Sequence, residues 1–135
     1  ALAWSPFYVM AHVVSKVSNS IFNTNYRIDG YKGLYSVFIM FGQAIYGLIG
    51  CLFCYLFCRE FFNKKIAVIS TIAILFGSQI TYYMWGLLPL SHVMSFCFTS
   101  CYLYFYKKHD THYKTALAAG MMILMRWQNA LFLLP

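Results

Sequence analysis

Long runs of apolar residues, separated by short polar stretches, make up most of this chain. A helix of about 17–25 mostly apolar residues can cross the hydrocarbon core of a bilayer. The pattern therefore predicts an all-α fold, a polytopic transmembrane helical bundle of about five spans. The predicted spans are residues 1–14 (part of a span), 34–58, 66–85, 91–106 and 115–134.

Polar and charged residues mark the connections between these spans. Residues 15–33 are polar and contain the turn signal Asp29-Gly30, so we predict a loop there. The connections at residues 59–65 and 107–114 carry six Lys and Arg residues, whereas the opposite side carries three. Because loops rich in Lys and Arg stay in the cytoplasm, we expect these two connections to be cytoplasmic and the 15–33 loop to be external.

Composition also points to a membrane environment. Of the 135 residues, 61% are hydrophobic and 10% are charged, against roughly 25% charged in ordinary soluble domains. We expect an integral multi-pass protein of a bacterial inner (cell) membrane. The chain starts inside one apolar run and ends just after another, so we interpret residues 1–135 as one membrane-embedded segment of a larger protein. The formal charge of +7 follows from the basic loops, and no nucleic-acid partner is expected.

Arg126 is the one charged residue inside a predicted span. A guanidinium in hydrocarbon costs about 2.5–3.5 kcal/mol on insertion scales, so such a residue is expected to face a polar cavity and to bind an anion. Gln128 and Asn129 follow it, and on a helix Asn129 would share a face with Arg126. The alternative is that Arg126 extends to the outer membrane surface, which is a long reach for one side chain.

A second polar group is expected at the start of the fourth span. His92 opens this span, and Ser95 and Thr99 follow on the same helical face. We predict a cavity open to the outside, where a charged headgroup could be held while its lipid tail stays in the bilayer. Its predicted lining is His92, Ser91, Ser95, Gln128 and Asn129, and weaker candidates are His12, Asp29 and Gln79.

Each of these residues also has a purely structural interpretation. Ser91 could cap the helix while His92 faces lipid headgroups. His12 could serve packing, and Asp29 could be a turn residue beside Arg27 and Lys32.

The five cysteines could suggest a metal site, because Cys51-x-x-Cys54 and Cys97-x-x-x-Cys101 are spaced like ligand pairs. Small residues four apart, such as Gly47 and Cys51, are also the pattern that lets transmembrane helices pack closely. We favour packing. No cofactor is evident from the sequence, no metal ligands are assigned, and a divalent cation is left open.

Four short motifs occur in a particular order: Ser5 to Tyr8, Asp29 to Tyr31, Pro89 to His92, and Gly120 to Ala130. In this order they resemble polytopic glycosyltransferases of the GT-C superfamily, which include protein O-mannosyltransferases and lipid A aminoarabinose transferases. The resemblance implies sugar transfer from a polyprenyl-phosphate donor at the outer (periplasmic or lumenal) membrane face. It also implies that Arg126 lies near the donor phosphate and that Pro89, Ser91 and His92 line the same cavity.

The family's acidic residue, which activates the acceptor, lies in a first external loop that precedes the part of the family matched here. The catalytic general base is therefore expected outside residues 1–135, and Asp29 does not take its place. The expected partners are the bilayer, a lipid-linked sugar donor and an acceptor that is a glycan, a lipid or a protein.

Two other classes of protein also fit the sequence. One is a transporter or flippase segment in which Arg126 binds an anionic lipid or solute, and the other is a structural membrane subunit. An acidic pair in an upstream external loop would favour the transferase, whereas a repeat of the five spans would favour the transporter.

Overall fold

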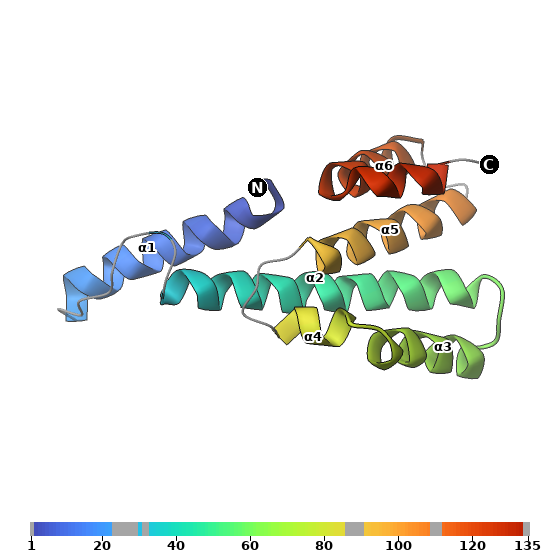
Figure 1. Ribbon diagram of the computed structural model, residues 1–135, viewed down its shortest axis with the longest axis horizontal. Helices are drawn as coiled ribbons and strands as arrows, with labels where there is room; N and C mark the ends of the chain where they lie inside the picture. The colour runs from blue at the N-terminus through green and yellow to red at the C-terminus, as the bar shows by residue number, and fades with distance from the viewer. Residues whose placement is uncertain (1, 23–29, 31–32, 86–90, 109–111, 134–135) are drawn as a thin grey trace.

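The computed structural model describes residues 2–22, 30, 33–85, 91–108 and 112–133. Every regular element in this part of the chain is helical, so the predicted all-α class is confirmed (Figure 1). The α-helices are α1 (Ser5–Phe22), α2 (Leu34–Arg59), α3 (Lys64–Gly77), α4 (Ile80–Trp85), α5 (His92–Lys107) and α6 (His112–Met125). Two 3₁₀ helices, η1 (Leu2–Trp4) and η2 (Trp127–Leu133), complete the order.

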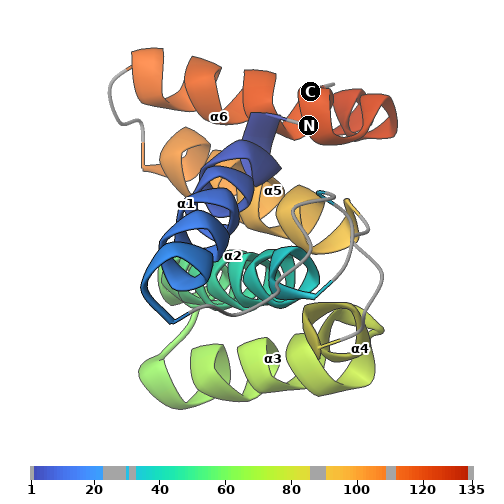
Figure 2. The same ribbon diagram turned by 90° about the vertical axis from the view of Figure 1, so that its left-hand side faces the viewer.

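Helix α2 is the central element. It packs against α1, α3, α4 and α5, whereas α6 packs mainly against α5. The end-on view of α2 in Figure 2 shows α5 and α6 on one side of it and α3 and α4 on the other. Helix α6 also lies across α2, because it is seen nearly along its axis in Figure 1 and side-on in Figure 2.

Small residues let the neighbouring helices approach α2 closely. A Cβ atom at Gly47 would lie 2.5 Å from the sulfur of Met84 in α4, and one at Gly50 would lie 2.7 Å from the ring of Phe96 in α5. Gly47, which the sequence predicts to serve helix packing, therefore does so, and Gly50 does the same toward α5. Cys97 and Cys101 are likewise buried, in a core cluster between α5 and α6.

The first helix is longer than predicted. Helix α1 continues to Phe22, so the predicted loop over residues 15–33 is wrong for residues 15–22. Ser15 is fully buried, and its hydroxyl donates to the carbonyl of Ala11 at 2.8 Å. This hydrogen bond satisfies the Ser15 hydroxyl within the helix. The polarity of Ser15 in the sequence does not reveal that its side chain can be buried in this way.

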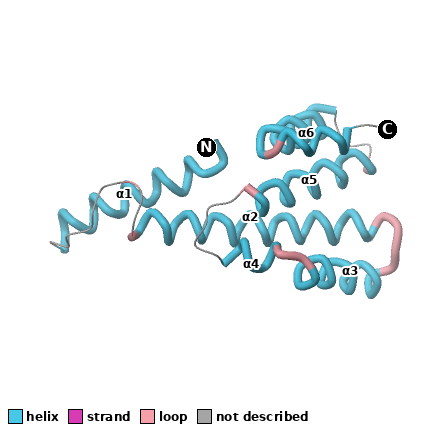
Figure 3. The backbone as a smooth tube through the Cα atoms, in the orientation of Figure 1, coloured by secondary structure: helices cyan, strands magenta, loops and turns pink. Residues whose placement is uncertain are grey.

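The helix predicted over residues 66–85 is broken, and Figure 3 shows the break as a loop segment. Helix α3 ends at Gly77, and Ser78 has extended backbone angles (φ −114°, ψ 169°) before α4 begins. The Ser78 hydroxyl donates to the carbonyl of Ile74 at 2.6 Å, which satisfies one carbonyl at the end of α3. The prediction of one continuous helix was wrong here, because the helix ends at Gly77 and the Ser78 side chain bonds to a carbonyl of its last turn.

The helix predicted over residues 115–134 is also broken, at Arg126, which lies between α6 and η2. The Met122 carbonyl accepts the Arg126 backbone N–H at 3.3 Å and the Asn129 side-chain amide at 2.9 Å. Asn129 thus caps the end of α6, and the backbone continues as a tighter 3₁₀ turn. Asn129 and Arg126 therefore do not share the face of one regular α-helix.

Among the described helices, α2 alone is long and apolar enough to cross a membrane by itself. Its 26 residues span about 39 Å, and its mean hydropathy reaches 2.0. The breaks leave α3 and α6 with 14 residues each, or about 21 Å, which is less than a hydrocarbon core of about 30 Å. The structure therefore gives a weak indication of membrane association, and the five-span arrangement stays a prediction.

Candidate functional site

Arg126 and His92 form the centre of the candidate site. Arg126 follows the last residue of α6, His92 is the first residue of α5, and Arg126 Nη1 lies 2.8 Å from His92 Nδ1. A guanidinium can only donate, so Nδ1 of His92 is the acceptor and carries no proton. The neutral imidazole therefore has its N–H at Nε2.

The ring of His92 is fixed from a second side by Tyr83 in α4. The two rings are stacked, with centroids 4.6 Å apart and planes 11° from parallel. The Tyr83 hydroxyl donates to Gln79 Oε1 at 3.0 Å, and Gln79 lies in the break between α3 and α4. His92 thus contacts Arg126, at the break after α6, and Tyr83, whose hydroxyl is bonded to Gln79 at the break before α4.

Asn129 connects η2 to α5. Its side-chain amide donates to Ser95 Oγ at 2.7 Å and to the Met122 carbonyl at 2.9 Å. Both Asn129 and Ser95 are buried. Because the same amide holds α5, the end of α6 and η2 together, Asn129 fixes the segment that begins at Arg126.

A pocket of about 450 Å³ opens beside these residues. Its lining combines six polar or aromatic-polar side chains with three apolar ones. They are Gln79, Tyr83, His92, Ser95, Thr99 and Asn129, with Ile80, Phe96 and Phe132. Arg126 is half-buried and does not line this pocket. Its guanidinium is hydrogen-bonded to His92, which does line the pocket.

The positive charge of Arg126 has no carboxylate partner in the described part of the chain. Glu60 is the one carboxylate that this part contains, and it caps the far end of α2. A guanidinium carries five N–H donors, and the side chain's recorded hydrogen bond to His92 uses one of them. The remaining donors of this half-buried cation can bind an anion.

The structure brings together five of the predicted residues: Arg126, His92, Ser95, Asn129 and Gln79. Thr99, predicted to continue the polar face of Ser95, lines the same pocket.

Other predicted residues lie elsewhere. Gln128 is exposed and is not part of the pocket lining. Ser91 precedes α5 but makes no capping hydrogen bond through its side chain. His12 pairs through Nδ1 with the Tyr35 hydroxyl at 2.8 Å, between α1 and α2. Asp29 lies outside the described residues.

Sequence reasoning missed Tyr83 and Phe132. In the sequence Tyr83 follows an apolar run together with Tyr82 and Trp85, a pattern typical of aromatic residues at a membrane interface. Its position on His92 depends on the break before α4, for which Gly77 and Ser78 give only a partial signal in the sequence. Phe132 was one of many apolar residues of its segment, and no signal distinguished it.

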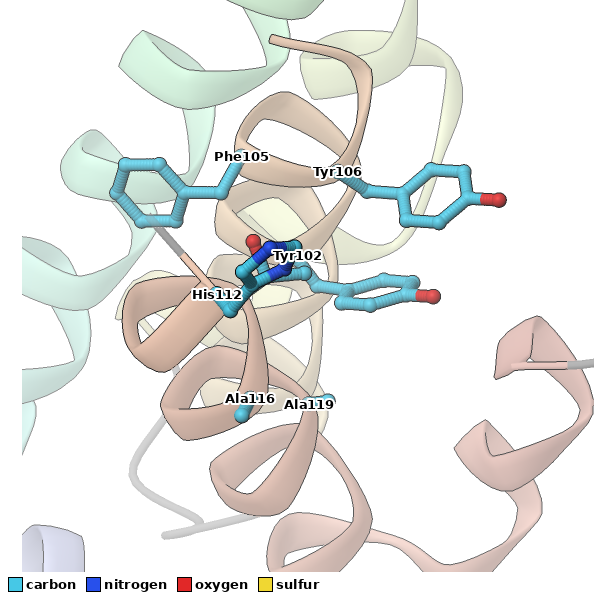
Figure 4. A pocket seen from close by; sticks show the side chains of 7 residues that line it. Tyr102, Phe105, Tyr106, His112, Ala116 and Ala119 are labelled. Atoms are coloured by element: carbon cyan, nitrogen blue, oxygen red, sulfur yellow. The ribbon is translucent and has the colours of Figure 1, made fainter. Parts of the chain in front are cut away.

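A second pocket, of about 410 Å³, lies between the end of α5 and the start of α6 (Figure 4). None of the residues predicted as a site lines it. Within the described residues, no group of three or more His, Cys, Asp or Glu side chains is placed to share a metal ion.

Comparison of the chain with protein-family models, with curated proteins and with solved structures found no match. The resemblance to GT-C glycosyltransferases therefore depends on its four short motifs. Of these, Asp29, Tyr31, Pro89 and Leu90 lie outside the described residues.

Proposed function

We propose that this chain binds the phosphate of a lipid-linked sugar through Arg126 and forms the donor-binding part of a membrane glycosyltransferase. The observation that carries the proposal is the position of Arg126, which has no carboxylate partner in the described chain and is bonded to the neutral imidazole of His92 beside a polar pocket. The proposed location is a bacterial inner membrane, in a multi-pass protein whose site faces outward.

A phosphate suits this cation for geometric and electrostatic reasons. The planar guanidinium can give two parallel N–H groups to two phosphate oxygens. His92 lines the pocket and carries an N–H at Nε2, so it can donate to the same phosphate or to the sugar. Stabilising the phosphate matters most when it departs, because negative charge then develops on it.

The two helix breaks support a site that is polar yet surrounded by apolar sequence. In lipid, backbone outside regular helices is tolerated only where it is buried in protein or lines a polar cavity. Both breaks adjoin the pocket, through Gln79 on one side and through Asn129 on the other. The apolar side chains Ile80, Phe96 and Phe132 could contact the isoprenoid tail next to its phosphate.

In the proposed reaction the bond between the sugar's anomeric carbon and the phosphate oxygen breaks, and a bond from the acceptor oxygen to that carbon forms. Polyprenyl phosphate leaves with the electron pair, held by Arg126. The acceptor proton passes to a general base. Glu60, the one carboxylate in the described residues, ends α2. The resemblance to GT-C glycosyltransferases implies that the base lies in an external loop preceding the part of the family matched here, and we propose that placement.

A second candidate function is favoured by the helix breaks themselves. Many secondary transporters bind substrates at discontinuous helices, and here His92 contacts both Arg126, at the break after α6, and Tyr83, in the helix that follows the break after α3. On this alternative Arg126 binds an anion that is carried across the membrane and no covalent bond is broken.

The two functions separate in a reconstituted system. Full-length protein in sealed vesicles is given a polyprenyl-phosphate sugar labelled in the sugar, and both label transfer and label position across the bilayer are measured. Transfer to an acceptor or to water, with polyprenyl phosphate released, supports the transferase. Movement of intact donor across the bilayer without release would instead identify a transporter and overturn the proposed reaction.

A further inference from the structure

Helices α2 and α5 end, and α3 and α6 begin, at the same end of the molecule (Figure 1). Basic residues are concentrated in these four segments. This group, called the basic end below, consists of Arg59, Lys64, Lys65, Lys107, Lys108 and Lys114. The carboxylates in the same stretches are Glu60 and Asp110, of which the structure describes Glu60. The basic end therefore carries an excess of positive charge and is separate from Arg126.

Aromatic rings support these cations. Lys107 Nζ in α5 lies 4.6 Å from the ring centroid of Phe61, in the turn between α2 and α3. Lys114 Nζ lies 6.0 Å from the ring centroid of Phe105. Phe61 and Phe62 remain more than half exposed, at 52% and 54%. Long cationic side chains beside exposed aromatic rings are typical of residues at a membrane interface.

An apolar groove of about 420 Å³ runs between α5 and α6 and reaches the basic end at Lys114. Lys114 is its one charged lining residue, and the others are Phe98, Cys101, Phe105, Leu117, Ala118 and Met121. An apolar groove that ends at a cation is complementary to a molecule with an apolar chain and an anionic headgroup.

Polar groups lie on the other flank of the same helix pair, in the pocket of Figure 4. Figure 4 shows the rings of Tyr102 and Tyr106 side by side, with their hydroxyls pointing the same way, and His112 between them and Phe105. Phe105 lines both this pocket and the apolar groove. Hydroxyl and imidazole groups are thus available close to where a head would lie.

We propose that the basic end binds an anionic phospholipid of the surrounding bilayer. The headgroup phosphate contacts Lys107 and Lys114, and one acyl chain occupies the groove between α5 and α6. The charge of the six basic residues complements the negative surface of a leaflet rich in anionic lipid. This binding does not depend on Arg126 or on sugar transfer, so either proposal can fail alone.

The test uses full-length protein in phosphatidylcholine vesicles, with spin-labelled phosphatidylglycerol and spin-labelled phosphatidylcholine as probes. Electron paramagnetic resonance gives the association of each probe with the protein. We expect phosphatidylglycerol to be preferred, and Lys107→Gln or Lys114→Gln to reduce the preference about fivefold each, equivalent to about 1 kcal/mol per cation. In the double variant, with both lysines replaced by Gln, the preference for phosphatidylglycerol should fall about 30-fold. In the wild type, 1 M salt should weaken this preference.

Two controls keep the result specific. Lys16→Gln removes the same charge from α1, at the other end of the molecule, and should leave the preference unchanged. Lys114→Arg keeps the charge and should retain the preference, which shows that a loss in Lys114→Gln is not misfolding. Equal association of both probes with the wild type, or an equal loss in Lys16→Gln and Lys107→Gln, would overturn the proposal.

Discussion

Arg126 is positioned by a neutral imidazole, and this choice of partner leaves its charge available. A carboxylate at 2.8 Å would neutralise the guanidinium, whereas His92 Nδ1 only accepts one of its N–H groups. The stacked ring of Tyr83 then restricts the rotation of His92. Sequence alone identified both Arg126 and His92 as candidates because each is a polar group at the edge of, or inside, an apolar run. Their contact spans 34 positions and could not be derived from spacing.

The contact predicts the behaviour of His92 variants. His92→Ala removes the acceptor from Arg126 and should lower transfer activity by about 10-fold or more, because a hydrogen bond to a charged group contributes about 1.5–3 kcal/mol. His92→Asn places an amide oxygen close to the position of Nδ1 and should lose less transfer activity than His92→Ala. Steady-state kinetics of the full-length protein, normalised to the amount folded, give both values. Unchanged kinetics in His92→Ala would return His92 to an interfacial role.

At the scale of elements, the breaks in the predicted helices are the features that composition could not supply. Gly77 and Ser78 give some signal of a break in the third predicted span, because both residues favour helix ends. No Gly or Pro marks the break at Arg126. There the side chain of Asn129 donates to the Met122 carbonyl, which also accepts the Arg126 backbone N–H, and to Ser95 Oγ in α5. The contact with Ser95 spans 34 positions and is visible only in three dimensions.

Asn129 is therefore expected to matter for stability as well as for the site. Asn129→Ala leaves the buried Ser95 hydroxyl without this donor, and an unsatisfied buried polar group costs about 1–3 kcal/mol. The Met122 carbonyl loses one of its two donors and keeps the Arg126 backbone N–H. Thermal unfolding in detergent should show a lower midpoint for Asn129→Ala. The adjacent Gln128 is exposed, so Gln128→Ala is the matched control and should leave the midpoint unchanged. Equal midpoints for both variants would argue against the capping role.

At the scale of the whole molecule, the central helix α2 was anticipated from its apolar length and small residues, and its glycines do face α4 and α5. The arrangement around it was not anticipated. Five spans side by side would require nearly parallel helices, whereas α6 lies across α2. Hydropathy indicates which segments are apolar, but the direction of each helix is determined by packing contacts such as those between α5 and α6.

The excess of basic residues at the basic end predicts that this end is cytoplasmic. Single-cysteine reporters at Asn25 and Asn63, in a variant lacking the five native cysteines, test this placement. A membrane-impermeant thiol reagent should label residue 25 in intact cells and should label residue 63 only after permeabilisation. The reverse pattern would place the basic end outside and would contradict an outward-facing Arg126.

The affinity of Arg126 variants for a lipid-linked sugar donor tests the central claim most directly. Arg126→Ala should weaken donor binding by about 10- to 150-fold, since it removes hydrogen bonds to a charged group that are worth about 1.5–3 kcal/mol. Arg126→Lys keeps the charge without the planar pair of donors, so its donor affinity should lie between those of the wild type and Arg126→Ala. Arg59 is the last residue of α2. Arg59→Ala serves as the charge control and should bind the donor with wild-type affinity. Wild-type donor affinity in a well-folded Arg126→Ala variant would contradict the account.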